Sequence, residues 1–183
     1  MGPAMRKLML TAHVISSVGW LGAVAAFLAV SITGLVSTDS QMVRSAYITM
    51  ELIGWFVIVP MSLASLVTGL IQSLGSVWGL FRHYWVIFKL LIATLATAVL
   101  FLHMQPISEV AQVAATTTLS AGDLRQLRIQ LAVDAGAAVL VLIVATALSI
   151  YKPRGLTRYG WRKQQDEKKK SHPIEGSSLP RSG

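Results

Sequence analysis

A few ionisable side chains stand inside long apolar stretches of this sequence. They are His13, Glu51, Lys89, His103 and Asp134. A charge placed within a bilayer is costly, so such a residue marks a functional site by default. Imidazole and carboxylate groups can hold a metal ion or exchange a proton. The chain has no cysteine, which excludes disulfides, thiolate metal sites and covalent haem attachment through a Cys-x-x-Cys-His motif.

Helical periodicity places each of these residues on a polar or small-residue stripe of its own apolar segment. We expect the four stripes to face one another and to form a polar interior. In chain order, the stripes contain His13, Ser17, Trp20 and Ser31; Glu51, Trp55, Ser62, Ser65 and Gly69; Lys89 and His103; and Asp134, Ala138, Val141 and Ala145.

Depth along the helices divides the five residues into two groups. His13 and Lys89 fall in the inner half, whereas Glu51, His103 and Asp134 fall near the outer side. Lys89 and His103 share a helix face at a separation of about 21 Å. We expect the outer three to converge into one polar cluster. The competing interpretations are structural: acids that complement helix dipoles, a lysine that snorkels to the interface, and histidines that are solvated or bonded to a neighbouring helix.

Four apolar stretches are long enough to cross a bilayer: about 8–36, 47–73, 84–104 and 129–151. The composition agrees, because 54% of the residues are hydrophobic and only 13% are charged. A soluble domain is typically about 25% charged. We therefore predict an all-α integral membrane protein, an antiparallel four-transmembrane-helix bundle over residues 5–151.

The net charge of +8 is concentrated where it favours lipid rather than nucleic acid. Most of the basic residues lie in the segment 152–183, which we expect to be a disordered cytoplasmic tail that contacts anionic lipid. Arg6, Lys7 and Arg82 add to the same side. The other loops are balanced, Asp39 with Arg44, and Glu109 and Asp123 with Arg125 and Arg128. The positive-inside rule then predicts a bacterial inner-membrane protein with both termini in the cytoplasm.

Local signals suggest where the helices bend and end. Pro60 predicts a kink in the second segment, and Pro106 predicts the end or a bend of the third. The sequence from Ser120 to Asp123 resembles a capping box for the fourth helix. His83 points away from the stripe of the third helix, and Met104 is expected to pack rather than to bind a ligand.

Motifs on the first and third helices resemble those of a known family. They are His13 with Trp20-Leu21-Gly22, and Trp85 with Lys89, followed by His103-Met104. Over about residues 8–104, the chain is similar to the CopD-like group of four-helix bacterial membrane proteins. It is more distantly similar to the haem-dependent protoporphyrinogen oxidases of the HemJ type. The resemblance implies b-type haem held by histidines, or a connection to copper.

We therefore expect a small inner-membrane protein whose buried polar site binds haem b and acts in redox chemistry, the reaction being open. The cofactor residues would be His13, Trp20, Lys89 and His103, with both histidines as metal ligands and Lys89 near an anionic group such as a haem propionate. One iron can bind both histidines only if a helix tilts strongly. The alternative is a non-enzymatic protein, a copper-related transporter or an accessory subunit. A homodimer is a further expectation.

Overall fold

The structure is a computed structural model that describes residues 2–75, 84–116, 125–151, 161, 162 and 165. Four helical rods in this part of the chain are long and apolar enough to cross a membrane, as the sequence predicts. The second rod is built from three consecutive elements. The elements are α1 (Pro3–Val36), α2 (Ser40–Ile53), the π-helical turn η1 (Gly54–Ile58), α3 (Val59–Gly75), α4 (Tyr84–Thr116) and α5 (Arg125–Tyr151).

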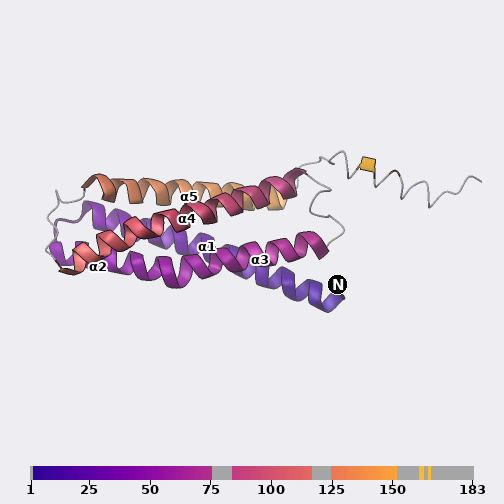
Figure 1. Cartoon of the computed structure of the whole chain (residues 1–183), viewed down its shortest axis with the longest axis horizontal. Helices are drawn as coiled ribbons and strands as arrows, with labels where there is room; N and C mark the ends of the chain where they lie inside the picture. The colour runs from indigo at the N-terminus through magenta and orange to yellow at the C-terminus, as the bar shows by residue number, and fades with distance from the viewer. Residues whose placement is uncertain (1, 76–83, 117–124, 152–160, 163–164, 166–183) are drawn as a thin grey trace, which may run out of the picture.

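The rods lie side by side along the long axis of the molecule (Figure 1). Helix α1 packs against α2, α3 and α5, and α4 packs against the same three helices. Helices α1 and α4 are therefore at opposite corners of the bundle. Side chains that reach from one to the other must cross its centre.

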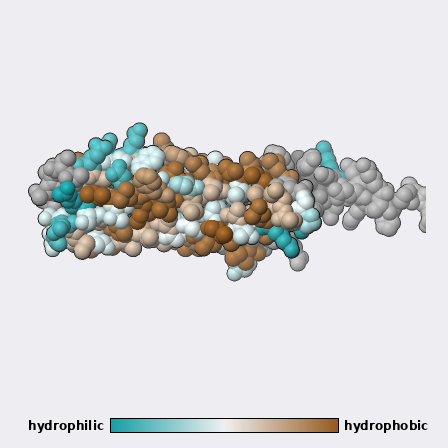
Figure 2. Space-filling view, turned by 90° about the horizontal axis from the view of Figure 1, so that it is seen from below, coloured by the Kyte–Doolittle hydropathy of each residue, from teal (hydrophilic) through white to brown (hydrophobic). Residues whose placement is uncertain are grey.

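Large apolar side chains cover much of the outside of the bundle. Phe56 is 76% exposed and Leu102 is 74% exposed. Figure 2 shows apolar atoms over most of the middle of one face and hydrophilic atoms mainly toward its two ends. A protein in water rarely exposes an apolar surface of this extent. The distribution is compatible with a bundle whose surrounding solvent is lipid.

The second rod begins about two turns earlier than the sequence pattern predicts. Asp39 caps α2, since its carboxylate accepts a hydrogen bond from the Gln41 backbone N–H at 3.0 Å. Close to Pro60, where the sequence predicts a kink, the helix contains the π-helical turn η1, which ends two residues before the proline. Proline lacks an N–H and its ring presses on the preceding turn, so a widened turn at this place has a local cause.

Of the two outcomes that the sequence leaves open at Pro106, an end or a bend of the third helix, the structure excludes the end. Helix α4 continues through Pro106 to Thr116. Ile107 and Val110, just after the proline, are 4% and 0% exposed. Their packing outweighs the one backbone hydrogen bond that proline cannot make. The capping box predicted at 120–123 and the outward position of His83 concern residues outside the described part of the chain.

Candidate functional site

A cavity of about 420 Å³ lies at the centre of the bundle, between α1, η1, α4 and α5. Its lining residues are apolar or aromatic except His103 and Asp134. They include Trp20, Ile92, Val99 and Met104. An apolar pocket with a few convergent polar groups is the usual form of a site for a small molecule or cofactor.

His103 and Asp134 meet at the wall of this cavity. Nε2 of His103 lies 2.8 Å from Oδ2 of Asp134, and both side chains are partly buried. No donor within the described chain is aligned for a hydrogen bond to Oδ2, although this oxygen is enclosed. The two atoms are therefore close, but their geometry is not that of a hydrogen bond. Oδ2 keeps an acceptor site that a bound molecule could satisfy.

The backbone fixes the ring of His103. Its Nδ1 donates a hydrogen bond to the carbonyl oxygen of Val99 at 2.8 Å, one helical turn earlier. A carbonyl oxygen only accepts, so Nδ1 is the nitrogen that carries the N–H in this contact, and Nε2 is the nitrogen that faces Asp134. A histidine oriented in this way by a backbone carbonyl is prepared to act as a ligand through its other nitrogen.

The structure brings together two of the three residues expected in the outer cluster. His103 and Asp134 are in contact, but no described contact joins the half-buried Glu51 to either of them. Trp20 is 4% exposed and forms part of the cavity wall. The expectation that Met104 packs is confirmed, because it is 1% exposed and its methyl group lies 2.8 Å from where a Cβ on Gly54 would stand.

His13 and Lys89 form a separate polar contact where α1, α3 and α4 meet. Lys89 Nζ donates to His13 Nε2 at 3.3 Å. Nδ1 of the same ring lies 3.1 Å from both the Ser65 carbonyl oxygen and the Thr68 hydroxyl. The ring is therefore protonated on Nδ1, and Lys89 takes the lone pair of Nε2. Gly69 permits this position, since a Cβ there would stand 3.0 Å from the imidazole Cε1.

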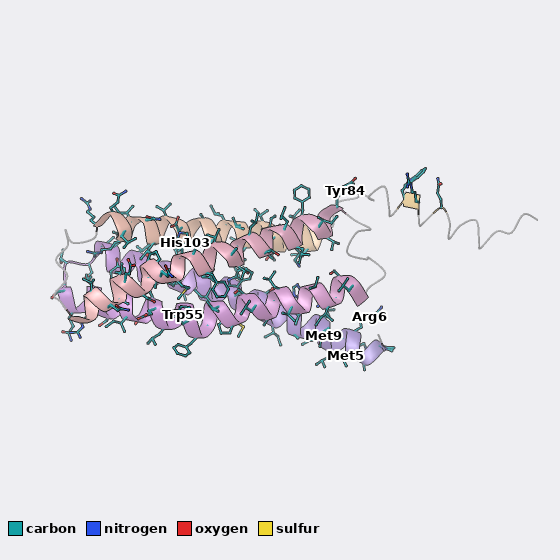
Figure 3. The ribbon with its side chains drawn as sticks, in the orientation of Figure 1. Met5, Arg6, Met9, Trp55, Tyr84 and His103 are labelled. Carbon is teal, nitrogen blue, oxygen red and sulfur yellow. The ribbon has the colours of Figure 1, made fainter. Side chains whose placement is uncertain are left out.

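His13 and His103 belong to two separate sites. His13 is in contact with Lys89, whereas His103 lies about 21 Å further along α4. Figure 3 shows His103 well inside the length of the bundle and Tyr84, where α4 begins, near the end at which α1 starts. A single iron cannot accept both rings. In this structure Lys89 contacts His13 and not His103.

Arg128 is a buried residue that the sequence interpretation placed among the balanced charges of a loop, which is wrong. It is 1% exposed, inside α5. Its Nε donates to the Tyr47 hydroxyl at 2.9 Å, a second guanidinium nitrogen donates to the Gly34 carbonyl oxygen, and the group lies over the Tyr47 ring. The side chain thus joins α1, α2 and α5. Helical spacing could have revealed it, because Arg128 extends the buried stripe of Leu131 and Ala135 by one turn.

Fold and site together define an all-helical protein with four potential membrane spans around an apolar cavity that holds one imidazole–carboxylate pair. No family model, curated protein or solved structure matches the chain. The chemistry of the site must therefore be argued from its own residues.

Proposed function

We propose that this chain is a multi-pass protein of the bacterial inner membrane that would bind haem b in the central cavity, with His103 as a ligand to its iron, and takes part in redox chemistry. The observation that carries the proposal is the oriented imidazole of a cavity-lining residue: Nδ1 of His103 is held by the Val99 carbonyl, and the other ring nitrogen, Nε2, lies beside Asp134. The resemblance to the HemJ-type oxidases supports the same cofactor, whereas the resemblance to the CopD-like group suggests copper, the alternative considered next. When bound, haem would supply one-electron chemistry at its iron.

The donor set fits haem better than a bare metal ion. In the ranges that the structure describes, no three His, Cys, Asp or Glu side chains meet at one point. Copper or zinc sites usually take three or four protein ligands, whereas haem brings four nitrogens and needs only one or two more. His103 would provide one ligand, and the apolar wall around Trp20 would receive the macrocycle. This comparison favours haem over the copper alternative.

Asp134 has a supporting part in this proposal. Its Oδ2 has an unfilled acceptor position beside Nε2 of His103. A hydrogen-bond donor of a bound molecule could fill this position, and Asp134 need not contact the metal.

The visible spectrum of the purified full-length protein tests the haem proposal. We expect a Soret band that shifts on reduction with dithionite, and haem and protein in about equal amounts, since one cavity takes one haem. Elemental analysis of the same sample distinguishes the alternative. Copper without a Soret band, or neither metal after expression with a haem precursor, would refute the proposal.

The membrane topology is part of the same proposal. We infer an antiparallel bundle with both termini in the cytoplasm, because four potential spans return the chain to its starting side and most of the basic residues follow Tyr151. A phosphatase reporter that is active only in the periplasm, fused after Gly160, should be inactive. The same reporter fused after Ser37, between α1 and α2, should be active. The opposite pattern would reverse the orientation.

A further inference from the structure

Among the residues that the structure describes, none supplies a counterion to Lys89 at its contact with His13 inside an apolar span. Lys89 is only partly exposed, three residues into the span Val86–Val113. The acids that the structure describes lie elsewhere: Asp39, Glu51, Glu109 and Asp134 are each about 20 Å or more from this contact, measured along the helices. An ammonium group in such a position is expected to have an anionic partner.

The surroundings of Lys89 are polar but neutral. Its partner His13 uses Nδ1 for the Ser65 carbonyl and offers only a lone pair. The hydroxyls of Ser17 and Ser65 lie 2.8 Å apart and bond to each other. An ammonium group has three N–H donors, and the contacts of the described residues use one of them. The remaining donors and the positive charge are therefore available for an oxygen anion.

We propose that Lys89, held in place by His13, binds a phosphate group, and that its source is the headgroup of an anionic phospholipid of the inner leaflet. Lys89 stands one turn from the end of its span, at a depth that a long side chain connects to the headgroup layer. Phe88 and Leu91, beside it on α4, are 59% and 52% exposed and offer an apolar surface to acyl chains. Lys89 and His13 do not line the central cavity, and the site does not require haem.

Thermal unfolding of the full-length protein in a neutral detergent tests this site. Added phosphatidylglycerol should raise the unfolding midpoint of the wild type by about 5 °C, whereas phosphatidylcholine with the same chains should have little effect. Lys89→Gln should remove the shift. Lys89→Arg, which keeps the charge, should retain most of it. Arg6→Gln is the matched control, because Arg6 is an exposed cation near the same end of the bundle, and should retain the full shift.

The outcomes separate the two sources of phosphate. If inorganic phosphate alone stabilises the wild type and not Lys89→Gln, the anion site stands and its ligand is a soluble phosphate. If phosphatidylglycerol stabilises Lys89→Gln as much as the wild type, the site is not at Lys89 and the proposal fails. Native mass spectrometry gives a second measurement: a lower preference for phosphatidylglycerol over phosphatidylcholine in Lys89→Gln than in the wild type supports the site, and equal preferences in the two proteins overturn it.

Discussion

Replacing His103 with alanine is expected to reduce the haem content of the purified protein to about a tenth of the wild-type value or less. The reason is that His103 is the only imidazole on the cavity wall within the described residues. Without it, the apolar pocket would hold the macrocycle by burial alone. The measurement is the ratio of Soret absorbance to protein absorbance after purification in detergent.

The matched variant is His13→Ala, which removes the same side chain from the other polar contact. His13 bonds to Lys89 and Ser65 and does not line the cavity, so this variant should keep its haem. Imidazole added to His103→Ala should restore part of the Soret band, because it can fill the vacated ligand position. If His13→Ala loses its haem and His103→Ala retains it, the ligand is His13 and our assignment of His103 is wrong.

Replacing Arg128 with alanine is expected to destabilise the bundle by about 3 kcal/mol. The truncation leaves the Tyr47 hydroxyl and the Gly34 carbonyl without the charged donor that joins them, and it opens a space among three helices. For a chain of this length, the loss corresponds to a fall of roughly 10 °C in the unfolding midpoint. Circular dichroism of the detergent-solubilised protein during heating would measure it.

Arg125→Ala provides the control, because Arg125 precedes Arg128 by three residues on α5 and is exposed. Its effect should stay within about 0.5 kcal/mol, as is usual for a surface substitution. Tyr47→Phe removes one of the hydrogen bonds to Arg128 and should have an intermediate effect. Equal midpoints for Arg128→Ala and Arg125→Ala would show that the buried guanidinium does not stabilise the bundle.

The sequence predicts the four long helices because their signal is local. A run of about 20 apolar residues is read without knowledge of its neighbours, and its physical cause is the cost of exposing polar groups to lipid. The helical period also places Asp134, Ala138 and Val141 on one face, and all three line the cavity. The same period puts Lys89 and His103 on one face of α4, at positions far apart along its axis.

The partners of these residues depend on tertiary structure. Which helices are neighbours decides that His103 meets Asp134 and that His13 meets Lys89, while Glu51 meets neither. Packing also carries α4 through Pro106, where the local signal predicts an end or a bend. Arg128 shows the difference most clearly. Its charge at the start of a span predicts a solvated residue, but Gly34 and Tyr47 from two other helices provide the acceptors that make burial favourable. The sequence alone thus determines the apolar helices and their faces, whereas long-range packing determines which polar groups meet, because those contacts join residues far apart in the chain.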